Sequence, residues 1–376
     1  MKVLMVTPSY YPIVGGSETA IRILAKRLNE IGIQTDVMTY NMNQKWHPIW
    51  KEETAKDGSS RILKIPAFNP AKIFGINPLE TLRIYLIPRP DFAMKFKEYD
   101  IIHFQGEADL SFPLFSYLIR KPKLFTSHAN YARFPRLKQL YKLFFPHLAD
   151  LYIAHEPKLL FDLGVPESKR LVFQSFGVNV DLFQPNEEKR VNNLILFVGR
   201  ITQIKGLHIL IEALPHVTSK TRLVVIGPKG DMKYSEDCLN EIDKINQKGF
   251  HKIDYIGSLD ETGLVPWYQK AAILIRPDID GFSGGLTTLE ALACATPVIG
   301  TGNHVVKNGV NGIIVSPKDA RELATAINQL MADKKLRRKY GTEGRKIVIE
   351  RFSWKKIAKD LAKIYACLLD KPAYYP

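Results

Sequence analysis

Two basic residues of one short loop, Arg200 and Lys205, have types and a spacing that suit the binding of phosphate. They belong to the stretch F-V-G-R-I-T-Q-I-K-G, residues 197–206, which follows an apolar run typical of a buried strand and precedes a helical pattern. Two fixed cations there can neutralise a diphosphate, and an arginine can bind two phosphate oxygens at once. The alternative is that both are solvated cations of a surface loop.

A glycine-rich loop and the helix after it form a second candidate site. Gly284 and Gly285 leave backbone N–H groups open to a phosphate at the positive end of that helix. Ser283 or Thr287 can cap the helix, and Glu290 lies inside it, where its carboxylate can accept hydrogen bonds from a ribose diol. The alternative is a helix-favouring glutamate that interacts only with the helix dipole.

Two features of the first half of the chain are also candidates for ligand contact. Gly15 and Gly16 end the loop after the first apolar run, where paired glycines let a phosphate or sugar pass close to the backbone. His128 follows another apolar run and can bond a sugar hydroxyl. The alternatives are a flexible turn and a structural histidine. For His103, inside a strand pattern, the structural role is favoured.

The order of apolar runs predicts the scaffold that holds these residues. Strands are expected at residues 2–7, 34–39, 100–104, 123–127 and 151–154, with a helix at 18–31. After a charged stretch, interpreted as a linker at 179–193, strands are expected at 194–198, 222–226, 253–256, 272–275 and 297–299. The helices expected in this second half are 206–214, 286–294, 319–332, 337–349 and 353–369.

This alternation predicts an α/β protein with two similar halves, each built on a parallel sheet. The expected domains are residues 1–178 and 179–352, with a last helix at 353–371 that packs back on the first domain. Ligands of open parallel sheets bind beyond the carboxyl ends of the strands. The cleft between the two domains is therefore the expected site.

Composition narrows the classes of function. The chain has 376 residues, and 53 Lys and Arg against 38 Asp and Glu give a net charge of +15, which indicates an anionic partner. With 45% hydrophobic residues the chain is globular rather than disordered. Three separated cysteines indicate neither a disulfide framework nor a zinc site and fit a reducing compartment. The sequence contains no run of about 18 apolar residues, so no membrane span is predicted.

Taken in order, these motifs resemble the GT-B glycosyltransferases of the retaining, glycogen-synthase-like family 4. The resemblance runs nearly from end to end. Its matching pieces are the Gly15-Gly16 loop, His128, G-R-x-x-x-x-K-G at 199–206, L-T-T-L-E-A-L-A-C-A-T-P-V-I-G at 286–300, N-G-V-N-G-I-I-V at 308–315 and F-S-W at 352–354. The resemblance implies two facing Rossmann-like domains, with the nucleotide-sugar on the C-terminal one and the acceptor on the N-terminal one.

The resemblance also assigns roles to individual residues. Arg200 and Lys205 would hold the diphosphate and stabilise the leaving group, and His128 would lie near the transferred sugar. Glu290 would hold the ribose. The donor site as a whole would be formed by Gly15, Gly16, Gly199, Gly284, Gly285, Leu286, Thr287 and Glu290. These enzymes generally need no metal, and the sequence has no D-x-D motif, so no metal or other cofactor is expected.

The chain departs from the family pattern near the donor sugar. The family places two glutamates eight positions apart around the glycine-rich loop, and here the position eight before Glu290 is Phe282. The nearest acid is Asp280, so Asp280, Phe282 and Ser283 are the candidates for contact with the donor sugar. The segment after P-V-I-G is also short, and the usual P-N-G-V-D hinge is replaced by S-F-G-V-N at 175–179.

The expected activity is transfer of a hexose-type sugar from a UDP- or GDP-sugar to an acceptor hydroxyl, with retention of configuration. An epimerase of the same two-domain shape is an alternative that needs no acceptor. A nicotinamide dehydrogenase is not supported, because G-x-G-x-x-G is absent. A basic nucleic-acid-binding protein is the non-enzymatic alternative, but no binding module is recognisable and no nucleic-acid partner is expected.

Basic residues concentrate in residues 110–149, a segment without any acid. Within it, R-L-K-Q-L-Y-K-L-F-F-P at 136–146 predicts a basic amphipathic helix, which is typical of membrane surfaces. The alternative is a core-facing helix with a solvated basic side. The membrane interpretation predicts a cytoplasmic protein, peripheral on the cell membrane, with a carbohydrate or lipid-linked acceptor. Its surface residues would be Arg133, Arg136, Lys138 and Lys142.

Overall fold

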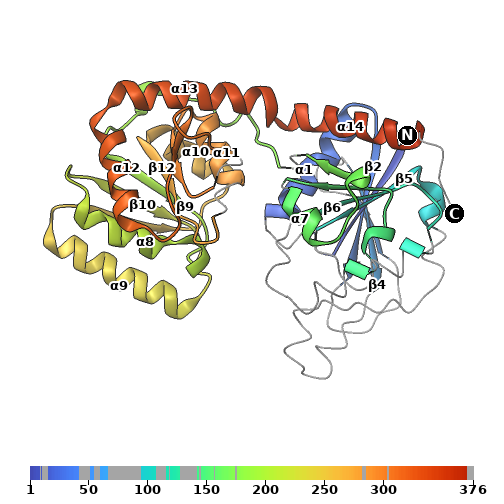
Figure 1. Cartoon of the computed structure of the whole chain (residues 1–376), viewed down its shortest axis with the longest axis horizontal. Helices are drawn as coiled ribbons and strands as arrows, with labels where there is room; N and C mark the ends of the chain where they lie inside the picture. The colour runs from blue at the N-terminus through green and yellow to red at the C-terminus, as the bar shows by residue number, and fades with distance from the viewer. Residues whose placement is uncertain are drawn as a thin grey trace. The chain divides into compact units, whose positions relative to one another are not determined.

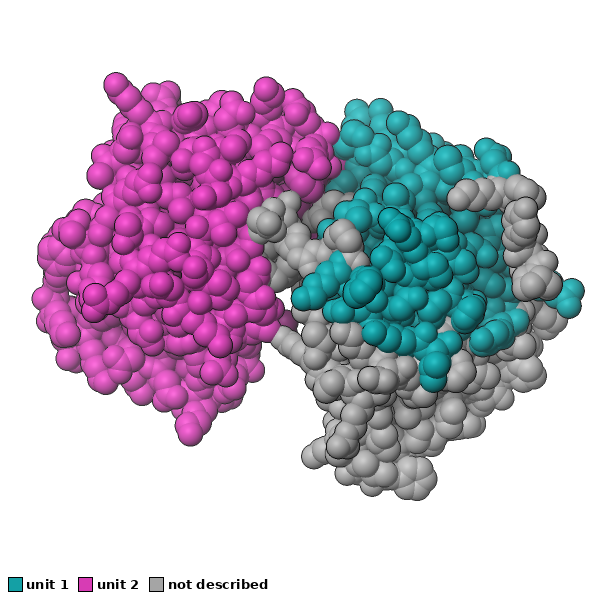
Figure 2. All heavy atoms as spheres, in the orientation of Figure 1, with its two compact units in different colours: residues 1–175, 354–376 teal, residues 176–353 magenta. Residues whose placement is uncertain are grey.

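The computed structural model divides into two compact units. Unit 1 comprises Met1–Ser175 and Trp354–Pro376, and unit 2 comprises Phe176–Ser353 (Figure 2). The structure describes residues 1–8, 10, 16–41, 51–54, 60–66, 95–106, 116–117, 119–127, 142–143, 145–155, 157–173, 176–281, 285–302 and 305–370.

Unit 1 is built on one eight-stranded sheet. Its strand order is β3-β4-β2-β1-β5-β6-β7-β8, and every neighbouring pair is parallel except β3 and β4. The strands are β1 (Lys2–Thr7), β2 (Gln34–Asn41), β3 (Lys51–Thr54), β4 (Arg61–Pro66), β5 (Ile101–Gln105), β6 (Lys123–Ser127), β7 (Leu151–Ala154) and β8 (Arg170–Val172). Central strands such as β5 and β6 are buried along their whole length, as parallel strands covered on both faces are.

The described α-helices of unit 1 come from widely separated parts of the chain. Helix α1 (Gly16–Glu30) follows β1 and buries the apolar stripe that the sequence predicts, and α7 (Pro157–Asp162) precedes β8. Helix α14 (Trp354–Asp370) follows unit 2 in the chain but belongs to unit 1, where it packs against α1 (Figure 1). This is the C-terminal crossover helix expected from the sequence.

Unit 2 contains a six-stranded sheet in the order β11-β10-β9-β12-β13-β14, parallel throughout. Its strands are β9 (Leu194–Val198), β10 (Arg222–Ile226), β11 (Lys252–Gly257), β12 (Ile273–Arg276), β13 (Val298–Gly300) and β14 (Gly312–Ile314). Its helices are α8 (Leu207–Ala213), α9 (Met232–Lys248), α10 (Glu261–Lys270), α11 (Leu286–Ala293), α12 (Ala320–Ala332) and α13 (Lys334–Arg351).

The two faces of this sheet carry separate cores because successive side chains of a strand point to opposite sides. Ile195 and Phe197 of β9 pack into one core with α8, α9 and α12. Leu196 and Val198 pack into the other with α10 and α11. Each fully buried side chain of this size stabilises the fold by about 1.5–3 kcal/mol, so the sheet is anchored from both sides.

The structure confirms the predicted fold class of two parallel α/β units, but it corrects the interpretation of residues 179–193 as a linker. Phe183 is fully buried in the core of unit 2, and the Arg190 guanidinium donates to the carbonyls of Ala271 and Cys294. This stretch therefore packs as part of unit 2. Its polar composition reflects hydrogen bonding to unit 2 rather than an extended connection.

Candidate functional site

The loop that follows β9 is fixed to the neighbouring strand ends by backbone contacts. The N–H of Gly199 donates to Ile226 O at 2.9 Å, and that of Ile201 donates to Pro228 O at 2.9 Å. Gly206 ends the loop with a φ of +67°, and a Cβ there would lie 2.0 Å from the carbonyl oxygen of Pro277. Only glycine fits this contact, which holds the loop against the carboxyl end of β12.

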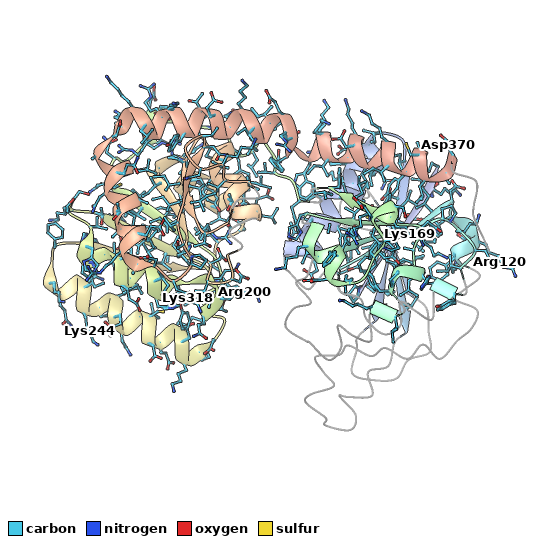
Figure 3. The ribbon with its side chains drawn as sticks, viewed as in Figure 1. Arg120, Lys169, Arg200, Lys244, Lys318 and Asp370 are labelled. Carbon is cyan, nitrogen blue, oxygen red and sulfur yellow. The ribbon has the colours of Figure 1, made fainter. Side chains whose placement is uncertain are left out.

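Arg200 and Lys205 extend from this loop in different environments. Arg200 is exposed on the surface of unit 2 (Figure 3). Lys205 is half-buried, and its Nζ lies 2.5 Å from Oδ1 of Asp278. Burial and then the nearby Arg276 charge lower the pKa of Lys205, whereas Asp278 opposes them. Lys205 is therefore a positioned cation, and Arg200 is the more accessible one.

Asp278 and Arg276 complete an ion-pair network that the sequence analysis missed. The Asp278 side chain has no exposed surface, and its Oδ2 accepts from Arg276 Nε at 3.0 Å. Arg276 also donates through Nη1 to the Thr287 hydroxyl of α11. The network therefore joins the loop after β9 to the first turn of α11. Its only trace in the sequence is R-P-D at the end of a buried strand pattern.

The first turn of α11 begins directly after a glycine. Gly285 is its N-cap residue, with a φ of 135° and no side-chain hydrogen bond to the cap, and Leu286 begins the helix. Thr287, one of the two caps expected from the sequence, is the second residue of the helix rather than its N-cap, and its hydroxyl accepts from Arg276. The other expected cap, Ser283, lies outside the described residues. The N–H groups of a helix N-terminus attract negative charge through their partial positive charges and the helix dipole.

Glu290 lies one turn further into α11, and its side chain is buried. Its Oε2 accepts a hydrogen bond from the Tyr268 hydroxyl of α10 at 2.7 Å. Burial raises the pKa of Glu290 to about 7, against the hydrogen bond from Tyr268 and the charge of Arg276, which lower it. The carboxylate is a hydrogen-bond acceptor held in an apolar environment at the same end of the sheet.

The structure describes only some of the remaining predicted site residues. Gly16 begins α1 in unit 1, and Asp280 is exposed at the end of the β12 loop. The predictions for Gly15, His128, Phe282, Ser283, Gly284, Arg133, Arg136 and Lys138 lie outside the described residues.

Two polar residues of unit 1 have structural roles. His103 is buried, and its ring nitrogens pair with the hydroxyls of Tyr365 and Thr126 at 2.7 Å each, as a structural histidine would. Lys123 lies in the basic segment of residues 110–149 but does not belong to an exposed basic surface. Its Nζ is buried and donates to the carbonyls of Ser116 and Ile119.

In the part of the chain that the structure describes, no helix is both long and apolar enough to cross a membrane. Within the same residues, no group of three or more His, Cys, Asp or Glu is placed to hold a metal ion. Metal independence stays a prediction.

Together, the residues of unit 2 suit a ligand with an anionic and a polyol part. Arg200, Lys205 and the α11 N-terminus supply positive charge beyond the carboxyl ends of β9 and β12, which are neighbours in the sheet. Glu290 supplies a hydrogen-bond acceptor one turn away. This arrangement can bind a diphosphate and an adjoining sugar hydroxyl pair.

Comparison with known families agrees with this chemistry. The sequence model described as "Glycosyl transferases group 1" matches residues 180–347, which lie in unit 2. The model described as "Glycosyltransferase Family 4" matches residues 14–163 in unit 1. The two matches together cover most of the chain.

Sequence identity to individual relatives is low. The chain is 24% identical to O-antigen chain mannosyltransferase C of Escherichia coli over 98% of this chain and 99% of the relative. It is 30% identical to an uncharacterized glycosyltransferase of Methanocaldococcus jannaschii, over 56% of this chain and 52% of the relative. It is 29% identical to a phosphatidyl-myo-inositol mannosyltransferase of Mycobacterium leprae, over 50% and 51%. The last two matches therefore span about half of each relative's length.

Solved structures share the fold at low identity. Sucrose-phosphate synthase from Thermosynechococcus elongatus aligns with a TM-score of 0.74 at 21% identity, over 98% of this chain and 99% of that one. The Anabaena protein HepE, solved in complex with UDP, aligns with a TM-score of 0.76 at 17% identity, over 98% and 100%. These likenesses show that the fold is GT-B.

Proposed function

The chain belongs to the group 1 glycosyl transferases, and from this premise we propose which reaction it catalyses. It transfers a hexose-type sugar from a UDP- or GDP-sugar to an acceptor hydroxyl with retention of anomeric configuration. The observation that carries the proposal is the gathering of Arg200, Lys205, the α11 N-terminus and Glu290 around one end of the unit 2 sheet.

Each group has a distinct role in the proposed reaction. Arg200, Lys205 and the α11 N–H groups bind the diphosphate and stabilise the charge that develops when the bond from the sugar C1 to the diphosphate breaks. The acceptor oxygen bonds to C1 on the same face, and its proton passes to the departing diphosphate. Glu290 accepts hydrogen bonds from the ribose and so orients the nucleotide. The proposal needs no metal, because these groups supply the positive charge themselves.

Three of the similar proteins support the proposed donor and acceptor classes. The UDP complex of HepE supports UDP-sugars as the first donors to test, and the E. coli relative, a mannosyltransferase, supports a hexose as the transferred sugar. GDP-sugars are the second donor class expected from the sequence. The M. leprae relative is named for a phosphatidyl-inositol acceptor, which supports a lipid-linked or glycan acceptor here. We place the protein in the cytoplasm, peripheral on the cell membrane.

Unit 1 carries a surface consistent with that location. Lys142 and Leu143 are exposed, and Lys142 lies against Gly164 just after α7. Phe161 of α7 is also exposed, with the Arg170 guanidinium 5.4 Å from its ring centroid. Exposed apolar side chains interleaved with cations are the features that bind an anionic bilayer surface.

Kinetics of the two loop cations test the proposed reaction. Arg200→Ala and Lys205→Ala should each lower kcat more than they weaken donor binding, because they act on charge that develops in the transition state. The assay measures release of nucleoside diphosphate and the configuration of the product. Lys244→Ala, on exposed α9, is the matched control and should keep normal kinetics (Figure 3). Unchanged kcat in both loop variants would remove their catalytic role.

Sedimentation with vesicles tests the membrane part separately. The wild-type protein should bind vesicles that contain anionic lipid at low salt and dissociate as salt rises. Lys142→Glu combined with Phe161→Ser should weaken this binding, whereas Lys244→Glu in unit 2 should not. If the wild-type protein does not bind at low salt, the acceptor does not reach the enzyme through this surface.

A further inference from the structure

Tyr268 is a buried tyrosine whose hydroxyl contacts the residue that is proposed to bind the ribose. It belongs to α10 and has no exposed surface, and its hydroxyl donates to Oε2 of Glu290 at 2.7 Å. The bond spans 22 residues of sequence and joins two helices on one face of the unit 2 sheet. Tyr268 engages one carboxylate oxygen, so the other can be directed to a ligand.

The tyrosine is itself held in place by surrounding residues. Its carbonyl oxygen accepts from Thr296 Oγ1 at 2.6 Å and from Arg190 Nη1 at 3.2 Å. Its ring packs edge-on against Phe183, with centroids 5.8 Å apart. Phe183 and Arg190 lie in the stretch that enters unit 2, so this stretch fixes Tyr268, which in turn fixes Glu290.

The charge state of Glu290 gives the hydroxyl a second effect. Burial raises the pKa of this carboxyl to about 7, and the Tyr268 hydrogen bond is the largest influence that lowers it. A hydrogen bond to the charged form favours that form. The charged carboxylate is the better acceptor for two sugar hydroxyls, so the hydroxyl extends the pH range in which Glu290 can hold a ribose.

We propose that Tyr268 is a positioning residue for the donor, which holds Glu290 oriented and ionised toward the ribose of a nucleoside diphosphate. This inference rests on the proposed function. Packing of the Tyr268 ring in the core does not require a hydroxyl, and the inference gives that hydroxyl a function.

A double-mutant cycle measured by calorimetry tests the assignment. The probes are UDP and GDP, titrated into the wild-type protein, Tyr268→Phe, Glu290→Gln and the double variant. Tyr268→Phe keeps the ring and should weaken binding about tenfold, the range expected for a hydrogen bond to a charged group. In the Glu290→Gln background the same change should have little further effect, because the two residues act as one unit.

The pH dependence gives a readout that a merely structural role would not change. Without the hydroxyl the pKa of Glu290 rises further, so the midpoint below which affinity is lost should move to higher pH in Tyr268→Phe. Tyr234→Phe is the control, since it removes a hydrogen-bonded hydroxyl from the opposite core of unit 2. Its affinity and midpoint should equal those of the wild-type protein.

The outcomes separate this inference from the proposed function. If the wild-type protein binds UDP or GDP but Tyr268→Phe binds equally well with the same midpoint, the role of Tyr268 is wrong and the function stands. Equal weakening with and without the Glu290 carboxylate would also overturn the role, since Tyr268 would then act elsewhere. If the wild-type protein binds neither nucleotide, the proposed function fails and the role of Tyr268 fails with it.

Discussion

Asp278 is the residue on which the charge balance of the candidate site depends. It lies fully buried between Lys205 and Arg276, so removal of its charge leaves two cations without a compensating anion. Breaking one partner of a buried ion pair costs about 3–5 kcal/mol. We expect Asp278→Asn to lower the free energy of unfolding by an amount of this order in urea or thermal denaturation.

The control for this prediction is Asp254→Asn in the same unit. Asp254 pairs with Arg222 at 2.7 Å, but both side chains are partly exposed. Surface pairs contribute about 0–1 kcal/mol, so this variant should unfold almost as the wild-type protein does. Equal losses of stability in the two variants would show that the Asp278 network is not the special feature described above.

Glu290 gives a second prediction, in the pH dependence of stability. Its pKa is about 7 in the folded protein, above the value of 4.5 for an unperturbed glutamate. The folded state therefore binds an extra proton between these values, and stability contributed by the protonated form is lost as the pH rises through 7. Glu290→Gln should thus be more stable than the wild-type protein by about 3 kcal/mol at about pH 8, and this difference should fall to about 1 kcal/mol at about pH 5.

The measurement is the free energy of unfolding of both proteins across this pH range. A stability difference that does not change with pH would contradict the raised pKa. Glutamine can still accept from the Tyr268 hydroxyl, so the comparison isolates the charge. A residue that destabilises the free protein at neutral pH is typical of a site selected for ligand binding.

At the scale of elements, the site depends on how closely the loop after β9 approaches the end of β12. Gly206→Ala places a methyl group against the carbonyl of Pro277 and strains a backbone with φ of +67°. Strain of this kind costs about 1–3 kcal/mol, and the clash adds to it. We expect a lower melting temperature and weaker nucleotide binding, since the loop that carries Lys205 must move.

Gly249→Ala is the control that separates the effect of backbone strain from the effect of a steric clash. Gly249 ends α9 with a φ of +74°, and a Cβ there would meet nothing within 4 Å. This variant therefore introduces the same backbone strain without the clash. If the two glycine variants lose equal stability and keep equal nucleotide affinity, the contact with Pro277 does not position the loop.

Elements with a strong local pattern could be predicted from the sequence. The strands at residues 2–7, 194–198 and 222–226 match β1, β9 and β10, because short buried apolar runs fix both type and length. Helix α9 was missed because only Ser235, Cys238 and Ile242 are buried, which leaves little apolar periodicity. Helix α10 was missed because it contains Pro266, which ordinarily marks a helix end.

The site was predictable to the extent that it is local. Arg200, Lys205 and Glu290 lie in strand–loop–helix patterns, which the sequence displays. Arg276 and Tyr268 act through contacts that depend on the order of strands in the sheet and on how α10 packs, and neither is visible in a single sequence. Asp280 was selected by counting back from Glu290, whereas the acid that the fold brings to Lys205 is Asp278.

At the scale of the whole molecule, two α/β units divide the expected tasks. Unit 2 contains the charged residues of the candidate site that are expected to bind a nucleotide-sugar. Unit 1 contains the exposed basic and apolar surface around α7. Helix α14 returns the chain to unit 1, where Tyr365 bonds the buried His103. The proposed function would give the net charge of +15 two separate uses, a few cations for a diphosphate and others for an anionic surface.

Thermal denaturation with UDP-, GDP- and ADP-sugars tests the central claim most directly, the binding of a nucleotide-sugar by unit 2. A ligand present at 100 times its Kd adds about 2.7 kcal/mol to the stability of the folded protein. We predict that sugars of one base raise the melting temperature of the wild-type protein and that this rise is lost when Arg200 and Lys205 are both changed to alanine. No rise with any of the three, or an equal rise in the double variant, would contradict the account.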